Sequence, residues 1–175
     1  MLKELVLGTM MSLTPTASAD TVPTEKQWQI DQAYCLAQNV YFEARNQPLA
    51  GQMAVISVTI NRVNDKRFPN SICGVVYEGP HRPSWKDNTV MIPVRHRCQF
   101  SWYCDGLSDR IHDMTTFDSI FTLTMGVVDG SYKIADITEG ATHYHADYVE
   151  PAWAKTKTKT IEIEDHIFYR WEIAE

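Results

Sequence analysis

Glu43 lies in a segment with the spacing of an amphipathic helix, at a position where such a helix normally has an apolar residue. It follows Leu36 by seven residues and Val40 by three, so in a helix all three side chains lie on one face. It also falls near the expected end of that helix, where the negative end of the helix dipole disfavours a carboxylate. Burial and the dipole both raise a carboxyl pKa, and a carboxyl group that stays protonated near neutral pH can act as a general acid. The alternative is a surface glutamate that reaches water or pairs with Arg45 or Arg62.

Two histidines, His143 and His145, are separated by a single residue and would share one face of a strand. Such a pair can ligate zinc, and with His112 or His166 and a carboxylate it would form the centre of a metallopeptidase or an amidase. The chain contains no His-Glu-x-x-His segment, the helical signature of many zinc peptidases. Ordinary polar histidines are therefore the simpler interpretation, and we expect neither a metal nor another cofactor.

The four cysteines, at positions 35, 73, 98 and 104, form an even set without a Cys-x-x-Cys pair. This pattern disfavours a zinc ribbon or a thioredoxin-like motif and suits two disulfides in an exported protein. Cys98 and Cys104 bracket a loop that is short enough for one bond to close, so we expect this pair to be linked. Cys35 and Cys73 would then be either paired with each other or simply buried.

Helical patterns fill the first part of the chain and one later segment. Residues 24–27 fit a capping box, and apolar residues then recur at helical spacing as far as Ala44. Residues 49–63 are apolar almost all round and too many for one strand, so a buried helix is expected there. Residues 71–77 suit a short helix, and 117–128 give another helical stripe.

The C-terminal third changes to the period of strands. Side-chain types alternate in twos from 155 to 164, and 166–171 is rich in residues that favour strands. A hairpin that turns near Glu164 and Asp165 follows, whereas residues 64–112 are rich in proline and loops. We therefore expect an α+β fold, a single small domain with helices first and a small antiparallel sheet at the C-terminal end.

Composition fits one such domain and excludes several classes of protein. Of 175 residues, 44% are hydrophobic and 22% charged, which is typical of a globular chain rather than a disordered one. A net charge of −6 disfavours a nucleic-acid partner, and no apolar run reaches the ~20 residues that a membrane span needs. Residues 1–19 combine Lys3, a short apolar stretch and small residues at 17–19, which predicts a signal peptide or a flexible N-terminal arm before a domain at 24–175.

Several segments, in the right order, give the chain a resemblance to the spore-cortex-lytic (SleB-like) family of cell wall hydrolases. The resemblance extends from about residue 33 to about residue 170. The segments that carry it are 35–45 (CLAQNVYFEAR), 51–55 (GQMAV), 61–63 (NRV), 68–77 (FPNSICGVVY), 99–101 (QFS) with 105–106 (DG), 142–145 (THYH) and 166–169 (HIFY). No single segment is specific, and it is their common order that makes the resemblance so.

The resemblance implies cleavage of peptidoglycan glycan strands by a small domain that looks like lysozymes and lytic transglycosylases. The family's catalytic glutamate lies in a Tyr-x-Glu-Ala-Arg segment, and this position is Glu43, which the helical pattern also singles out. Phe100, Ser101 and Tyr144 match family positions that could line a sugar groove, and Tyr41 is a further stacking candidate. The resemblance also implies an exported, wall-facing enzyme, periplasmic or extracellular, whose small size would suit a phage endolysin.

The chain departs from the family pattern in three places. Asn46 and Gln47 replace a Gly-Glu pair, Glu164-Asp165 replaces a Gly-rich turn, and 81–96 looks like an insertion. Without a carboxylate at position 47, we favour a lytic transglycosylase, because this reaction needs only one glutamate as acid and base. A muramidase-type hydrolase needs two carboxylates.

Three alternatives stay open from the sequence. Hydrolysis would follow if a second carboxylate lay near Glu43, and the candidates are Asp105, Glu139, Asp147 and Glu150. A zinc-dependent peptidoglycan amidase or peptidase would use His143 and His145. A carbohydrate-binding module without catalysis would need no particular role for Glu43.

Overall fold

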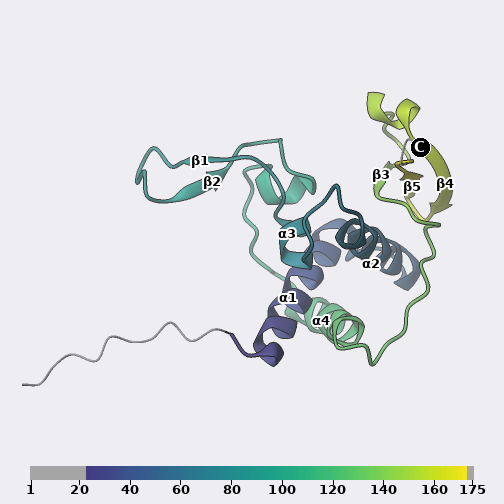
Figure 1. The fold of residues 1–175 in the computed structure, drawn as a ribbon, viewed down its shortest axis with the longest axis horizontal. Helices are drawn as coiled ribbons and strands as arrows, with labels where there is room; N and C mark the ends of the chain where they lie inside the picture. Colours follow the sequence, from purple (N-terminus) through teal and green to yellow (C-terminus); the bar gives the residue numbers. More distant parts are fainter. Residues whose placement is uncertain (1–22, 173–175) are drawn as a thin grey trace, which may run out of the picture.

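The computed structural model describes residues 23–172, so the expected signal peptide or arm at 1–19 lies outside the described residues. Within that range the structure begins with helices and ends with a small sheet (Figure 1). The helices are α1 (Glu25–Ala44), α2 (Leu49–Asn64), α3 (Ile72–Val76) and α4 (Met114–Val128), with short 3₁₀ helices η1 (Ser101–Cys104) and η2 (Ala152–Thr156). The strands are β1 (His81–Pro83), β2 (Met91–Pro93), β3 (His143–Ala146), β4 (Thr158–Ile163) and β5 (His166–Arg170). The predicted α+β class, with helices first, is confirmed.

The helices α1, α3 and α4 begin at side chains that accept hydrogen bonds from free backbone N–H groups. Thr24 Oγ1 accepts from the Gln27 N–H at 3.2 Å, and Asp113 caps α4 by accepting from the Thr116 N–H at 3.0 Å. The helix predicted at 49–63 is α2, which begins directly after Pro48, a residue accepted at the start of a helix. The short segment predicted at 71–77 is α3, with Ser71 as its cap.

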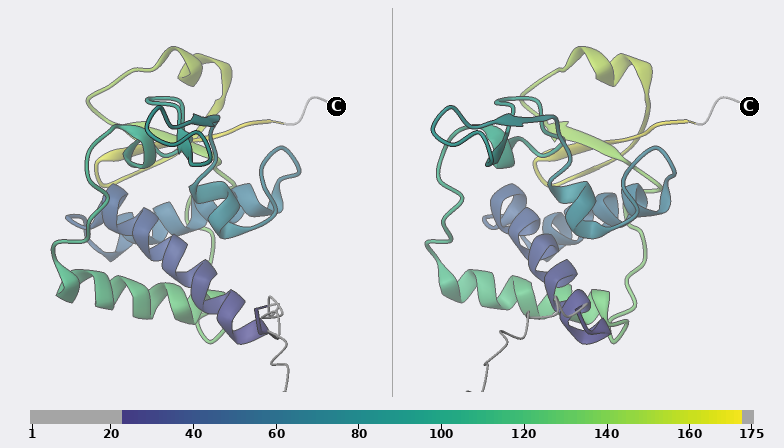
Figure 2. Two further views of the ribbon diagram at one scale, coloured as in Figure 1. Left: turned by 90° about the vertical axis from the view of Figure 1, so that its left-hand side faces the viewer. Right: turned by 60° about the vertical axis from the view of Figure 1, so that its left-hand side comes forward.

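The core forms where α1 crosses the other helices. Figure 2 shows α1 running obliquely over α4, with α2 and α3 beside it. Leu36 and Val40 of α1, Val55 and Ile56 of α2, and Ile120 of α4 are all buried in one cluster. This cluster holds the C-terminal end of α1 rigidly, because the residues before Glu43 are packed on several sides.

The sheet has the order β3-β5-β4 and is antiparallel throughout. Its central strand places Phe168 against Ala54 and Val58 of α2, so the sheet rests on that helix. The hairpin between β4 and β5 turns at Glu164, whose φ of 51° is in the left-handed region that favours glycine. The turn predicted at Glu164-Asp165 is therefore present although the chain lacks the family's glycine there.

Two details of the C-terminal and middle segments differ from the expectation. The strand predicted from residue 155 begins only at Thr158, because 152–156 form η2. Residues 81–93, expected to be loop, contain the hairpin β1–β2, which projects away from the body of the molecule (Figure 1). Its strands are three residues long and mostly exposed, so they carry no alternation of buried and exposed positions that a sequence pattern would reveal. Trp85, at the end of this hairpin, is 81% exposed.

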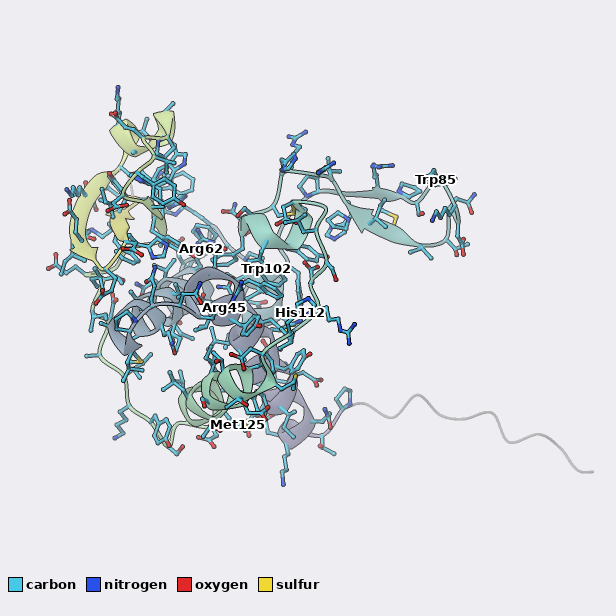
Figure 3. The ribbon with its side chains drawn as sticks, turned by 180° about the vertical axis from the view of Figure 1, so that it is seen from behind. Arg45, Arg62, Trp85, Trp102, His112 and Met125 are labelled. Atoms are coloured by element: carbon cyan, nitrogen blue, oxygen red, sulfur yellow. A yellow bond between two sulfur atoms is a disulfide. The ribbon has the colours of Figure 1, made fainter. Side chains whose placement is uncertain are left out.

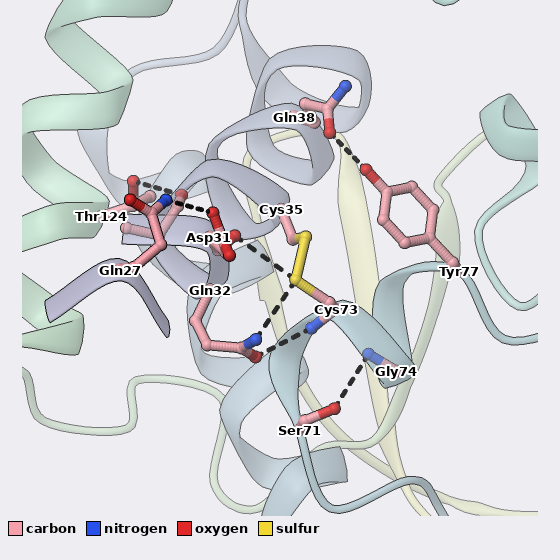
Figure 4. Close-up of a disulfide and its surroundings, with 11 residues drawn as sticks. Gln27, Asp31, Gln32, Cys35, Gln38, Ser71, Cys73, Gly74, Tyr77 and Thr124 are labelled. Carbon is pink, nitrogen blue, oxygen red and sulfur yellow. Dashed lines mark hydrogen bonds between the residues drawn. A yellow bond between two sulfur atoms is a disulfide. The ribbon is translucent and has the colours of Figure 1, made fainter. Parts of the chain in front are cut away.

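All four cysteines are paired. Cys98 is bonded to Cys104, the pair that the spacing favours, and Cys35 is bonded to Cys73. The second bond joins α1 to α3, where the Gln32 side chain also accepts a hydrogen bond from the Cys73 N–H at 3.1 Å (Figure 4). Cys35 and Cys73 are therefore paired with each other rather than buried as free thiols.

Candidate active site

Glu43 is the penultimate residue of α1 and lines an open cleft of about 510 Å³. The walls come from the end of α1, from α2, from η1 and the residue pair before it, and from the segment around β3. They are formed by Phe42, Arg62, Gln99, Phe100, Ser101, Trp102, Asp105, Tyr144, His145, Ala146, Tyr148, Val149 and His166. Segments far apart in the sequence therefore meet around one carboxyl group.

Tyr144 holds the Glu43 carboxyl group. Its hydroxyl donates to Glu43 Oε2 at 2.8 Å, and its ring packs edge-on against His166 and beside Phe168. Burial raises the pKa of Glu43, while the Tyr144 hydrogen bond and the charge of Arg62 act in the opposite direction. The net shift is upward, which is the direction that a general acid requires.

Arg62 is a buried cation beside this carboxyl group, and the sequence indicates it only as a possible ion-pair partner of Glu43. The residue is 4% exposed, and its Nε donates to the Thr142 carbonyl at 2.7 Å. Its guanidinium carbon lies 4.7 Å from the centre of the Phe100 ring, within the range of a cation–π contact. Burial lowers the pKa of Arg62, and the nearby Glu78 and Glu43 oppose that change. The signal for Arg62 in the sequence was a cation beside the apolar stripe of a helix.

The predicted sugar-contact residues Phe100 and Ser101, at the start of η1, differ in their surroundings. Ser101 is exposed and lines the Glu43 cleft. Phe100 also lines the cleft, but it is 2% exposed and lies under the Arg62 guanidinium. Trp102 stacks on Phe42 with ring centres 4.7 Å apart, and Phe42 was not among the predicted residues. Phe42 lines both this cleft and a smaller hollow of about 190 Å³, and Glu43 also lines both.

Tyr41 is placed differently from the expectation of sugar stacking. The residue is 3% exposed, packs against Phe117, and accepts a hydrogen bond from the Asp113 N–H at 3.1 Å. It belongs to the core and borders a second hollow rather than the Glu43 cleft. We therefore leave Tyr41 out of the proposed sugar contacts.

Gln47, in the place of the family's second glutamate, lies behind the catalytic candidate. Its Nε2 is 3.3 Å from Nδ1 of His166, and it lines a hollow of about 190 Å³ that also contains Glu43. A Cβ atom at Gly51 would lie 2.1 Å from the Gln47 Oε1, so the glycine is needed for this side chain to lie against α2. An amide in this position cannot act as a general base. Residue 47 therefore supplies no second carboxylate near Glu43.

The histidines that suggested a metal site are not gathered around one point. His143 and His145 of β3 both contact Trp153, and His145 Nε2 lies 3.0 Å from the Tyr169 hydroxyl. His166 instead contacts Tyr144 and Gln47. Burial and the charges of Arg62, Lys157 and Arg67 lower the pKa of His143 to about 3. Within residues 23–172 no group of three or more His, Cys, Asp or Glu side chains is arranged to hold a metal ion.

Of the four carboxylates considered as a second catalytic group, Asp105 lines the Glu43 cleft. Glu139, Asp147 and Glu150 do not line it. Asp165, which was not among these four, lines the smaller hollow that also contains Glu43. Of the four carboxylates named from the sequence, Asp105 is thus the one that shares the cleft with Glu43.

A half-buried glutamic acid, held by a tyrosine hydroxyl in an open polar cleft on a small α+β domain, defines a class of sites in which a carboxyl group can act as a general acid. The comparisons with known proteins point to a particular family within this class. A family model described as Cell Wall Hydrolase matches residues 46–169, and the chain belongs to that family. The matched range begins three residues after Glu43, so this match does not include Glu43.

The relatives are enzymes that act on the spore cortex. The spore cortex-lytic enzyme of Bacillus subtilis strain 168 is 54% identical over 43 residues, which is 25% of this chain and 14% of the relative. That of Halalkalibacterium halodurans is 39% identical over 70 residues, which is 37% of this chain and 21% of the relative. The matched segments therefore cover 14% and 21% of the length of these two relatives.

A solved structure covers more of the chain. The catalytic domain of the germination-specific lytic transglycosylase SleB from Bacillus anthracis matches with a TM-score of 0.54 and 26% identity. The match covers 85% of this chain and 100% of that domain. The chain therefore has the fold of a complete catalytic domain from this family.

Proposed function

We propose that this protein cleaves peptidoglycan glycan strands as a lytic transglycosylase, with Glu43 as the single acid and base. The observation that carries the proposal is the Glu43 carboxyl group, half-buried in an open cleft, fixed at Oε2 by Tyr144 and raised in pKa by its surroundings. The SleB domain with the same fold is described as a lytic transglycosylase, which supports the same chemistry here.

In the first step the protonated Glu43 gives its proton to the oxygen that bridges N-acetylmuramic acid and N-acetylglucosamine. The bond between that oxygen and C1 of the muramic acid breaks, and positive charge develops on the sugar ring. Tyr144 holds Oε2, so the other carboxyl oxygen is the one that faces the substrate. The charge of Arg62 stabilises the carboxylate that forms when the proton leaves.

In the second step the Glu43 carboxylate takes the proton of the 6-hydroxyl group of the same muramic acid. The oxygen of that 6-hydroxyl group bonds to C1 and closes a 1,6-anhydro ring. The reaction therefore consumes no water and returns Glu43 to the protonated state. The amide of Gln47 fits this sequence of steps, because no second carboxylate is needed. A pKa above the ordinary value suits both steps, since Glu43 must first be protonated and then accept a proton.

Asp105 supports a second candidate function, hydrolysis of the same bond. It shares the Glu43 cleft and would act as a base toward water or as a nucleophile in a muramidase-type reaction. The two reactions give different products: transglycosylation yields 1,6-anhydromuropeptides, whereas hydrolysis yields muropeptides with reducing ends.

Digestion of purified peptidoglycan with the wild-type protein, Glu43→Gln and Asp105→Asn, with products identified by mass spectrometry, tests the proposal. We expect anhydromuropeptides from the wild type and from Asp105→Asn, and none from Glu43→Gln. Reducing-end products that disappear in Asp105→Asn would replace transglycosylation by hydrolysis. Cut stem peptides, or unchanged activity in Glu43→Gln, would refute cleavage of the glycan by this site.

The same proposal places the protein outside the cytoplasm, facing the cell wall. Two disulfides in 175 residues fit an oxidising compartment, and the proposed partner, peptidoglycan, lies there. No helix in residues 23–172 is both long and apolar enough to cross a membrane. Export would be tested by fractionating cells that express the full chain and locating it by immunoblot.

A further inference from the structure

A second cleft, of about 490 Å³, opens beside the cleft that contains Glu43. The two clefts share Phe42, Trp102 and Asp105 in their walls. The small hollow behind Glu43 shares Phe42 and Arg45 with the second cleft. In Figure 3, Arg45, Trp102 and His112 lie in this region, between the helices and the segment that carries η1. Three hollows therefore meet around Phe42, next to the carboxyl group.

Three adjoining hollows are more than an unbranched polymer would occupy at this point. A glycan strand that passes Glu43 requires one path on each side of the scissile bond. Peptidoglycan is branched, because its muramic acids carry peptide stems on the lactyl group at C3. The muramic acid of the scissile bond must place C1 at Glu43, so its stem leaves the strand within the same sugar ring. A third hollow at this point has a natural occupant in that stem.

The lining of the second cleft differs in charge from a surface suited to neutral sugars. Charged or titratable side chains of both signs surround it: Arg45, Arg110, His112, Asp105, Asp109 and Asp113. A peptide stem carries free carboxylates, and stems with a diamino acid also carry an amine. Cations of the cleft match the carboxylates, and Asp109 matches an amine, whereas Asp113 is already engaged as the cap of α4.

Arg45 is the most fixed of these cations. Its guanidinium carbon lies 4.9 Å from the centre of the Tyr41 ring, and its Nη1 donates to the Tyr41 carbonyl at 3.3 Å. It follows Glu43 by two residues at the end of α1 and lines both the second cleft and the hollow behind Glu43. A guanidinium held in one place can form paired hydrogen bonds with a carboxylate, which an unrestrained lysine cannot do as selectively.

We infer that the second cleft binds the peptide stem of the muramic acid at the scissile bond, and that Arg45 pairs with a carboxylate of that stem. This inference rests on the proposed cleavage of glycan strands and adds a specificity to it. The enzyme then prefers strands that carry stems over strands from which the stems have been removed.

The test compares intact glycan strands with the same strands after an amidase has removed the stems. The variants are Arg45→Gln and, as a matched control, Arg82→Gln, which lies on the projecting β1 strand. For Arg45→Gln we expect the ratio of kcat/KM on stem-bearing to stripped strands to fall about tenfold, as for loss of one charge-assisted hydrogen bond. Arg82→Gln should keep the wild-type ratio.

A binding measurement separates this inference from the chemistry. Isothermal titration of Glu43→Gln and of the double variant Glu43→Gln with Arg45→Gln against both kinds of strand does not depend on turnover. Tighter binding of stem-bearing strands that is lost in the double variant supports the inference. Equal affinity or equal kcat/KM for the two substrates, or the same ratio in Arg45→Gln as in the wild type, overturns it while cleavage by Glu43 stands. A wild type that cleaves neither substrate refutes the proposed function itself. If Arg45→Gln loses activity in equal proportion on both substrates, Arg45 acts on Glu43 and not on the stem, and the inference is overturned.

Discussion

At the scale of single residues, burial raises the pKa of Glu43, and the contact with Tyr144 moderates that rise. The Tyr144 hydrogen bond lowers the pKa of Glu43, so Tyr144→Phe should raise that pKa further. Glu43 then stays protonated to higher pH, and the alkaline limb of the kcat/KM profile moves upward. We also expect kcat to fall about tenfold to a hundredfold, because the carboxyl group loses its orientation.

A pH profile measured on soluble glycan strands checks this prediction, with Tyr132→Phe as the control for removing a tyrosine hydroxyl elsewhere. Tyr132 is exposed and packs at Gly126, outside the clefts described above. An alkaline limb that stays in place in Tyr144→Phe would show that the hydroxyl does not act on the ionisation of Glu43.

The raised pKa of Glu43 also has a consequence for stability. The folded protein holds a proton on Glu43 in a pH range where the unfolded chain, with a pKa near 4.5, has released it. The contribution of this group is therefore complete below about pH 4.5 and is lost as the pH rises toward the folded-state pKa. Glu43→Gln removes this loss, and its amide oxygen can still accept from Tyr144.

We expect the stability of Glu43→Gln relative to the wild type to increase as the pH rises from about 4.5 toward neutrality. Urea unfolding of both proteins across that range measures the difference. A difference that is constant with pH would mean that Glu43 titrates alike in the folded and unfolded chains.

The residues of the site were only partly predictable from the sequence. Glu43 could be found because a carboxylate interrupts an apolar helical face, and this signal is local. Arg62 and Phe42 could not be assigned in the same way, because their roles depend on contacts with η1 and the segment before β3. No periodicity records which residues of distant segments meet across a cleft.

At the scale of elements, η1 is fixed to the helices by a chain of buried hydrogen bonds. Trp102 Nε1 donates to Asn39 Oδ1 at 3.0 Å, and Asn39 Nδ2 donates to Thr59 Oγ1 at 3.1 Å. Asn39 has no exposed surface. This chain connects η1, α1 and α2, and so it determines where Phe100 and Ser101 lie relative to Glu43.

Asn39→Leu should therefore lower the free energy of unfolding by about 1–3 kcal/mol, because the Trp102 N–H is left buried without an acceptor. It should also speed hydrogen exchange in residues 99–105. Thr59→Val is the matched control, since it removes one bond of the chain but leaves Trp102 paired with Asn39. Equal exchange in residues 99–105 of both variants would contradict a specific hold on η1.

Prediction of the elements succeeded where a pattern is long. The helices α1, α2 and α4 each bury apolar side chains over 15 to 20 residues, and the hairpin β4–β5 follows a run of residues that favour strands. The hairpin β1–β2 has strands of three residues and no buried face, so nothing in residues 81–93 repeats often enough to indicate strands. The sequence could mark that segment only as an insertion.

At the scale of the whole molecule, the two disulfides divide stability and function between them. The bond between Cys35 and Cys73 joins α1 to α3 across a sequence separation of 38 residues. The bond between Cys98 and Cys104 spans 6 residues and closes the segment that carries Phe100, Ser101 and Trp102. The first restrains the unfolded chain over a long loop, while the second restrains one wall of the Glu43 cleft.

Loop-closure entropy grows with loop length, so replacing both cysteines of a pair by serine should have unequal effects. We expect a loss of about 4 kcal/mol for Cys35→Ser with Cys73→Ser and about 2 kcal/mol for Cys98→Ser with Cys104→Ser. The order should be reversed for activity measured well below the melting temperature. The short loop holds the wall of the cleft, so its loss should reduce kcat/KM more, whereas the long-loop variant keeps the cleft while it remains folded. Urea unfolding of the two double variants measures the order of stability, and peptidoglycan digestion measures the order of kcat/KM. If the Cys35→Ser, Cys73→Ser variant is the more impaired in both measurements, the short disulfide serves the fold rather than the site.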